Sequence, residues 1–171
     1  MMGFVFVTGG ARSGKSELAV RLGRESGSAV TFIATATAGD AEMEERIRGH
    51  RSGRPEHWST VDAPLALLPA IAAVSTDDFL IVDCLTLWVS NLLESGQSAG
   101  EIRALAEGTA DELARRRGVV VTNEVGLGIV PANELARTFR DVLGAVNSTF
   151  AARAERSLLM VAGRTLELKQ A

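Results

Sequence analysis

The chain has 171 residues, of which 46% are hydrophobic and 23% charged, a composition typical of one folded domain with a buried core. Its formal net charge of −3 argues against general binding to nucleic acids, whose phosphates attract basic surfaces. No apolar stretch approaches the roughly 20 residues that a membrane helix needs, so we expect no membrane span. One cysteine, Cys84, excludes an internal disulfide, and with no export signal visible we expect a cytoplasmic protein.

The first third of the chain alternates strand and helix signals. Residues 3–8 are apolar and predict a buried strand, and residues 15–26 predict a helix with leucines and alanines on one face. Residues 29–36 predict a second strand that ends in a threonine-rich loop. Residues 40–51 favour a helix, because acidic side chains come early and arginines late, the order that complements a helix dipole.

The rest of the chain continues this alternation. We expect helices at 64–74, 85–93, 100–117 and 133–154, strands at 79–83, 119–122, 157–162 and 165–168, and loops at 94–99 and 123–131. The three arginines that end the third of these helices are expected to be a solvated terminus. Alternating strands and helices predict a mainly parallel sheet covered on both faces, and the last two strands predict an antiparallel hairpin at its edge.

Residues 9–16 read GGARSGKS behind the first strand, which fits the phosphate-binding loop pattern G-x-x-x-x-G-K-[ST] in its strand-loop-helix setting. Glycines let successive backbone N–H groups turn toward phosphate oxygens, and the following helix adds the positive end of its dipole. Lys15 supplies a mobile charge and is one of only two lysines, beside sixteen arginines. Ser16 offers a hydroxyl to magnesium. The alternative is a glycine-rich turn that caps a helix.

Ligands of open parallel sheets bind beyond the carboxyl ends of the strands. Asp83 ends a predicted strand, and we expect it to be the acidic partner of the phosphate loop, holding magnesium directly or through water. The alternative is a hydrogen-bonded aspartate at a strand end. Asn123 and Glu124 follow another strand and either contact substrate or brace their loop.

His50 lies among arginines in residues 46–55, RIRGHRSGRP. A neutral imidazole is a competent nucleophile toward phosphorus and arginines hold phosphates, so this cluster is compatible with covalent nucleotidyl transfer. On the residues alone, a solvated helix end with a surface histidine is the simpler interpretation. His57, beside Trp58, favours packing over catalysis. The two histidines and one cysteine have no zinc-ligand spacing, and no G-x-S-x-G hydrolase motif is present.

Taken together, GGARSGKS, FIATA, ERIRGHRSGRPEHWSTVD and TNEVGLGIVP closely resemble the bifunctional adenosylcobinamide kinase / adenosylcobinamide-phosphate guanylyltransferases of cobalamin biosynthesis, from the first strand to the last. The resemblance implies an α/β fold: a single three-layer P-loop domain of the RecA-like type spanning residues 1–171. It also implies phosphorylation of adenosylcobinamide with ATP or GTP, then transfer of GMP from GTP through a guanylylated histidine. His50 matches that histidine, and Lys15 would stabilise the departing pyrophosphate.

The same resemblance implies a set of nucleotide contacts. They are Gly9, Gly10, Ala11, Arg12, Ser13, Gly14, Lys15, Ser16, Ala34, Thr35, Ala36, Arg51, Ser52, Gly53, Arg54, Asp62 and Asp83, with Ser16 and Asp83 also as ligands of Mg²⁺. Family members often have glutamate at the positions of Asp62 and Asp83, so the reach of both carboxylates is shorter here. No general base for the kinase step is evident, and Glu124 is the candidate.

The resemblance further implies a homo-oligomer, specifically a trimer, that binds a corrinoid substrate, while the net charge of −3 leads us to expect no nucleic-acid partner. From the sequence, Leu85, Leu87, Trp88 and Leu92 are either core residues or subunit contacts, and the core is favoured. Two alternatives remain for the function: a small-metabolite kinase without a covalent intermediate, and a GTP-binding switch. The Asn-Lys-x-Asp sequence that would favour a switch is absent.

Overall fold

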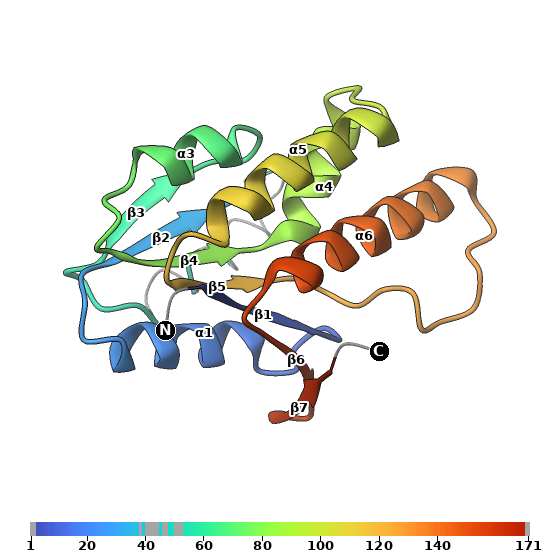
Figure 1. The fold of residues 1–171 in the computed structure, drawn as a ribbon. Helices are drawn as coiled ribbons and strands as arrows, with labels where there is room; N and C mark the ends of the chain where they lie inside the picture. The colour runs from blue at the N-terminus through green and yellow to red at the C-terminus, as the bar shows by residue number, and fades with distance from the viewer. Residues whose placement is uncertain (1–2, 38, 40–44, 46–47, 50–52, 170–171) are drawn as a thin grey trace.

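The structure, a computed structural model, describes residues 3–37, 39, 45, 48–49 and 53–169 (Figure 1). Seven strands form one sheet in the order β3-β2-β4-β5-β1-β6-β7. The strands are β1 (Phe4–Gly9), β2 (Val30–Ala34), β3 (Ser59–Asp62), β4 (Phe79–Asp83), β5 (Gly118–Val121), β6 (Arg156–Val161) and β7 (Arg164–Leu168). Neighbouring strands are parallel except β6 and β7, which form an antiparallel hairpin at one edge.

Helices cover both faces of this sheet (Figure 1). They are α1 (Lys15–Glu25), α3 (Leu67–Ala73), α4 (Leu85–Glu94), α5 (Ala99–Leu113) and α6 (Glu134–Arg153). Helix α1 lies on one face, and α3, α4, α5 and α6 lie on the other. The expected α/β fold, with a mainly parallel sheet and an antiparallel C-terminal hairpin, is therefore confirmed.

Each central strand supplies side chains to two cores, because successive residues point to opposite faces. Phe4 and Phe6 of β1 pack with the four-helix side, whereas Val5 and Val7 pack with α1. All four are at most 6% exposed. Strands buried on both faces read as continuous apolar runs, which is why the central strands are visible in the sequence.

Two expectations differ from the structure. Strand β3 was not predicted: it is a four-residue edge strand whose residues are exposed or half-buried, so it carries no apolar run. The helix expected to reach residue 117 ends at Leu113, and of the three arginines expected to form a solvated terminus only Arg115 is exposed. Arg116 is 6% exposed and donates to the Val74 carbonyl, while Arg117 donates to the Asp77 carbonyl and thereby ties the start of β5 to the start of β4.

The helix expected at residues 40–51 lies largely outside the described residues. Glu45, Arg48 and Gly49 are described and helical, and Glu45 pairs with Arg48. Among the described helices, none is long and apolar enough to cross a membrane. Leu85, Trp88 and Leu92 are core residues, at most 1% exposed, so they give no support for a subunit contact.

Candidate active site

The phosphate loop joins the end of β1 to the first turn of α1. Gly9 has a φ of 150°, and a Cβ there would clash with the Met160 carbonyl of the paired strand β6. Arg12 and Gly14 have φ values of 54° and 96°, in the left-handed region that favours glycine. These conformations reverse the chain direction, and the first helical bond runs from Leu18 N to Gly14 O at 3.0 Å. The predicted strand-loop-helix geometry is thus present.

Lys15 lies at the centre of this loop and is only 7% exposed. Its Nζ donates to Gly9 O at 3.0 Å, to Gly10 O at 2.6 Å and to Ser13 Oγ at 3.4 Å. Burial lowers the pKa of the Lys15 ammonium, and the nearby Cys84 and Asp83 act in the opposite direction. The amine is therefore held by loop oxygens, with which an incoming phosphate would compete.

Ser16 and Asp83 meet across the site. Ser16 Oγ, in the first turn of α1, donates to Asp83 Oδ2 at the end of β4 over 2.8 Å. A hydroxyl and a carboxylate are the oxygen donors that Mg²⁺ accepts, and Mg²⁺ takes its remaining ligands from phosphate and water. The residues described include no group of three or more His, Cys, Asp or Glu side chains suited to a metal. The donor pair fits magnesium rather than zinc.

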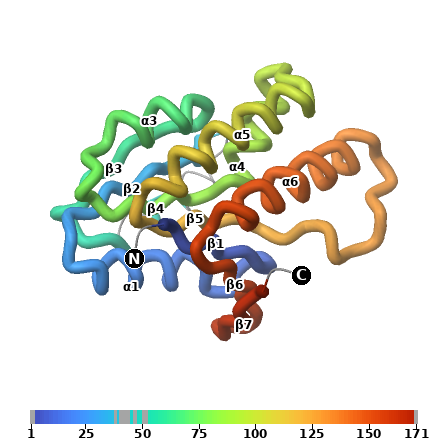
Figure 2. Tube along the Cα trace, viewed as in Figure 1, coloured from blue at the N-terminus to red at the C-terminus, as the bar shows by residue number. Residues whose placement is uncertain are grey.

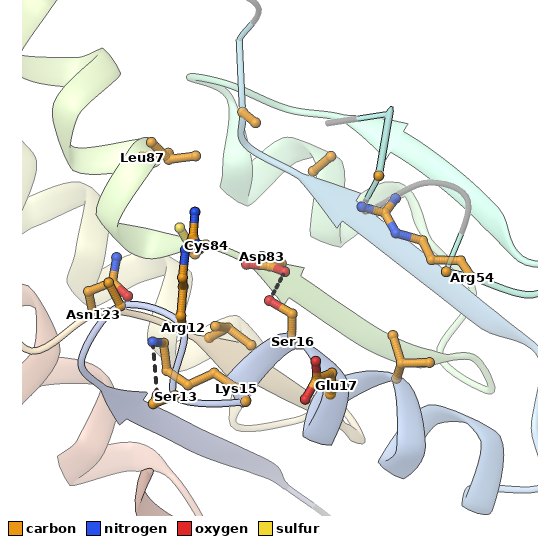
Figure 3. A pocket seen from close by; sticks show the side chains of 18 of the residues that line it. Arg12, Ser13, Lys15, Ser16, Glu17, Arg54, Asp83, Cys84, Leu87 and Asn123 are labelled. Atoms are coloured by element: carbon orange, nitrogen blue, oxygen red, sulfur yellow. Dashed lines mark hydrogen bonds between the residues drawn. The ribbon is translucent and has the colours of Figure 1, made fainter. Parts of the chain in front are cut away.

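A pocket of about 1050 Å³ opens over the phosphate loop. Most of the predicted contacts line it: Ala11, Arg12, Ser13, Gly14, Lys15, Ser16, Ala34, Ala36, Gly53, Arg54, Asp62 and Asp83. Figure 3 shows Arg54 on one side of the phosphate-loop side chains and Asn123 on the other. His50, Arg51 and Ser52 lie outside the described residues, but Gly49 and Gly53, which flank them in sequence, both line the pocket.

Sequence reasoning missed one whole wall of this pocket. The side chains of Glu17, Val20, Arg21 and Arg24 line it from α1. Their spacing of three to four residues is that of one helix face, so it was visible in the sequence once the helix was predicted. The end of β4 and the first turn of α4 add Cys84 and Leu87. The sequence does not predict these two residues, because their position at the pocket depends on the pairing of β4 with β2 and β5.

Thr35 is buried and does not line the pocket. Its Oγ1 donates to Cys84 O at 2.7 Å and accepts from Cys84 N at 2.8 Å. Asn91 Nδ2 donates to Thr35 O at 2.8 Å. The side chain therefore braces the ends of β2 and β4, which hold Ala34 and Asp83 at the pocket. Its nucleotide contact stays a prediction, as does that of Gly9 and Gly10, which are not among the lining residues.

Arg54 and Trp58 connect the chain before β3 to the sheet and to α1. The Arg54 guanidinium lies 3.3 Å from the centroid of the Phe32 ring, a cation–π contact. Trp58 is 8% exposed and packs against Gly23 of α1, where a Cβ would lie 2.8 Å from the indole. His57 is exposed, so the expected packing role belongs to Trp58 alone.

A buried polar network fixes the chain after β5. Thr122 Oγ1 donates to Asn147 Oδ1 at 2.8 Å, and Asn147 Nδ2 donates to Asn123 O at 3.1 Å. Asn123 N donates to Thr86 Oγ1 at 2.7 Å. These bonds connect α4, β5 and α6, and they hold Asn123 at the pocket wall.

Glu124 is also braced. Its N donates to Gly9 O at 3.1 Å, and its Oε1 accepts from Gly126 N at 2.5 Å. Because the carboxylate is engaged within its own loop and does not line the pocket, the bracing alternative is the better supported one. A general-base role for Glu124 stays a prediction.

Fold and pocket together define a P-loop nucleotide-binding protein of the α/β class. A family model described as cobinamide kinase / cobinamide phosphate guanyltransferase matches residues 5–168, and the chain belongs to this family of enzymes. It is 48% identical over 167 residues to the bifunctional adenosylcobalamin biosynthesis protein CobP of Pseudomonas aeruginosa, covering 95% of each chain. It is 39% identical over 180 residues to CobU of Salmonella typhimurium, covering 96% of this chain and 99% of that one. The expected family is confirmed, and membership supports both a kinase and a guanylyltransferase activity.

Solved structures agree on the fold alone. The flagellar accessory protein FlaH from Methanocaldococcus jannaschii matches with a TM-score of 0.52 at 14% identity, over 98% of this chain and 78% of that one. The RadB recombinase matches with a TM-score of 0.56 at 16% identity, over 92% of this chain and 73% of that one. These matches confirm the RecA-like P-loop architecture.

Proposed function

We propose that this enzyme catalyses two successive transfers at one nucleotide pocket. The first phosphorylates the aminopropanol hydroxyl of adenosylcobinamide with ATP or GTP, and the second transfers GMP from GTP to the new phosphate, giving adenosyl-GDP-cobinamide. The observation that carries the proposal is that residues 11–16 of the phosphate loop line the same pocket as Gly49 and Gly53, the two residues that flank positions 50–52 in the sequence. The bifunctional names of the relatives support two activities.

In the kinase step, the substrate hydroxyl oxygen attacks the γ-phosphorus and the bond from that phosphorus to the β–γ bridging oxygen breaks. The nucleoside diphosphate leaves, and the hydroxyl proton passes to solvent. Lys15 would exchange its bonds to the Gly9 and Gly10 carbonyls for bonds to phosphate oxygens. A loose transition state makes strong base catalysis less necessary, so positioning and charge carry this step.

In the guanylyl step, a neutral imidazole nitrogen of His50 attacks the α-phosphorus of GTP. The α–β bridging oxygen leaves with pyrophosphate, and a phosphorus–nitrogen bond forms. An oxygen of the substrate phosphate then attacks the same phosphorus, the phosphorus–nitrogen bond breaks, and free histidine returns. Arg54 and Arg12, both at the pocket, would balance charge on the transferring group.

Ser16 and Asp83 are the residues that would hold Mg²⁺. When bound, the ion neutralises phosphate charge and so weakens the bond to either leaving group. The Ser16 hydroxyl would turn from Asp83 toward the ion, and the Asp83 carboxylate would bind it directly or through water.

The test is to incubate the protein with GTP labelled at the α-phosphate, denature it, and measure label that is acid-labile and alkali-stable. We expect label on the wild type and on His57→Ala, which changes the exposed second histidine, and none on His50→Ala. Undiminished label on His50→Ala would overturn the covalent assignment. Conversion of adenosylcobinamide to labelled product, with ATP and GTP compared as donors, tests the substrate and the donor.

The proposal extends to location and assembly. We propose a cytoplasmic enzyme, supported by a single cysteine that is free and buried. We also propose a homo-oligomer, with a trimer as the expected size from the family resemblance. Sedimentation velocity measures that state directly.

A further inference from the structure

The connection from β5 to α6, residues 122–133, presents large aliphatic side chains to solvent. Leu127 is 86% exposed, Ile129 is 98% exposed and Val130 is 61% exposed. The trace of this connection runs outward from the sheet before it returns to the start of α6 (Figure 2). Aliphatic side chains grouped in this way on a surface mark a binding site more often than isolated exposed ones do.

Both ends of this connection are fixed. The polar network of Thr86 and Asn147 holds Asn123 at its start. At its end, Arg137 Nη1 donates to Pro131 O at 3.0 Å and to Ala132 O at 2.7 Å. Side chains between two fixed ends are presented in a defined place, which lowers the entropic cost of binding a ligand there.

The connection also begins at the transfer site. Asn123 lines the nucleotide pocket, and the next residue, Glu124, donates from its N to Gly9 O in the phosphate loop at 3.1 Å. Any acceptor must bring its reacting oxygen to the phosphates held by this loop. The part of a large acceptor that cannot enter beside the nucleotide must lie on the adjoining surface.

We propose that residues 125–130 form the docking surface for the corrinoid ring of the acceptor, an inference that rests on the proposed function. The pocket of about 1050 Å³ must already hold a nucleoside triphosphate, so the macrocycle of the acceptor has to dock outside it. The sequence Val-Gly-Leu-Gly-Ile-Val carries no charged group. It therefore suits the hydrocarbon parts of the macrocycle, whose flexible arm would reach past Asn123 to the phosphates.

The test uses a double variant, Leu127→Ser with Ile129→Ser. Both side chains are exposed, so the fold does not depend on their burial. The matched control is Leu166→Ser with Leu168→Ser, which removes two leucines that are 60% and 41% exposed on the β6–β7 hairpin. Equilibrium dialysis with adenosylcobinamide measures binding, GTP affinity and covalent labelling by GTP are measured alongside, and sedimentation reports assembly.

We expect the loop variant to bind adenosylcobinamide at least about tenfold more weakly, with GTP affinity and labelling unchanged, and the control to match the wild type. Equal corrinoid affinity in all three proteins overturns the inference. So does a loop variant that keeps its corrinoid affinity but sediments as a smaller species, because the surface then binds a second copy. If the wild type neither binds nor converts adenosylcobinamide, the proposed function is overturned as well. If the wild type is active and the loop variant keeps its affinity for adenosylcobinamide, this inference alone is overturned.

Discussion

We expect Cys84 to make the stability of the protein sensitive to alkaline pH. The residue is 9% exposed, and burial together with the neighbouring Asp83 raises the pKa of the Cys84 thiol from 9.0 to about 11. Because the folded pKa is the higher one, the fold binds this proton more tightly than the unfolded chain does. The resulting stability is fully present below pH 9 and is lost as the pH rises toward 11. At pH 10.5 the loss amounts to about 2 kcal/mol of unfolding free energy, and above pH 11 it approaches about 3 kcal/mol.

Few other groups obscure this effect, since the chain has no tyrosine and two lysines. The lowered pKa of Lys15 acts in the opposite direction, because a fold that favours the neutral amine gains stability as the pH rises. Comparing the wild type with Cys84→Ala isolates the thiol. In urea unfolding at pH 7.5 and pH 10.5, we expect the wild type to lose about 2 kcal/mol more than the variant between the two pH values. An equal loss in both proteins would refute the assignment of the raised pKa to Cys84.

Two further predictions test the site. Asp83→Asn keeps the shape of the side chain and removes its charge, so we expect the Mg²⁺ concentration for half-maximal activity to rise on the order of tenfold or more. The control is Asp78→Asn, at the opposite end of β4, whose Mg²⁺ titration should match that of the wild type. An unchanged titration of Asp83→Asn would contradict the metal role. Phe32→Leu removes the ring under Arg54 and about 1 kcal/mol of cation–π attraction, so we expect the KM for GTP to rise about fivefold. Phe6→Leu, an equally buried change in the other core, should lower stability alone, and steady-state kinetics showing the same KM in both variants would remove the orienting role of Phe32.

Much of the fold could be predicted because strands that are buried on both faces of the sheet are continuous apolar runs in the sequence. Three strands carry site residues at or just after their carboxyl ends, and all three are apolar runs followed by loops or helices: β1, β4 and β5. β3 could not be predicted this way, since an edge strand that pairs only with β2 needs no apolar run. The end of α5 was misplaced because Arg116 looks like a solvated cation in sequence but is buried against Glu112 and the Val74 carbonyl.

The residues of the site likewise fall into those that a local motif predicts and those that depend on contacts between distant parts of the chain. The phosphate loop is a local motif, so residues 9–16 were predicted together with their geometry. The bracing role of Thr35 was not predictable, because its partners at Cys84 are 49 residues away in the chain. The Thr122–Asn147 bond likewise joins a strand to a helix that only the tertiary fold brings together. Contacts of this kind decide which side chains face the ligand and which hold the walls in place.

The pocket contains other groups that are nucleophiles in principle, and their environments argue against them as carriers of GMP. With a pKa of about 11, Cys84 is a thiolate in roughly one molecule in 10⁴ at pH 7, and the thiol form is a poor nucleophile. The amine of Lys15 donates to two carbonyls and a hydroxyl, so its nitrogen faces acceptors rather than an electrophile. A neutral imidazole has neither handicap, because it needs no deprotonation to attack phosphorus. These environments support our proposal that His50 carries the GMP, and label that survives in Cys84→Ala but not in His50→Ala is the pattern this chemistry requires.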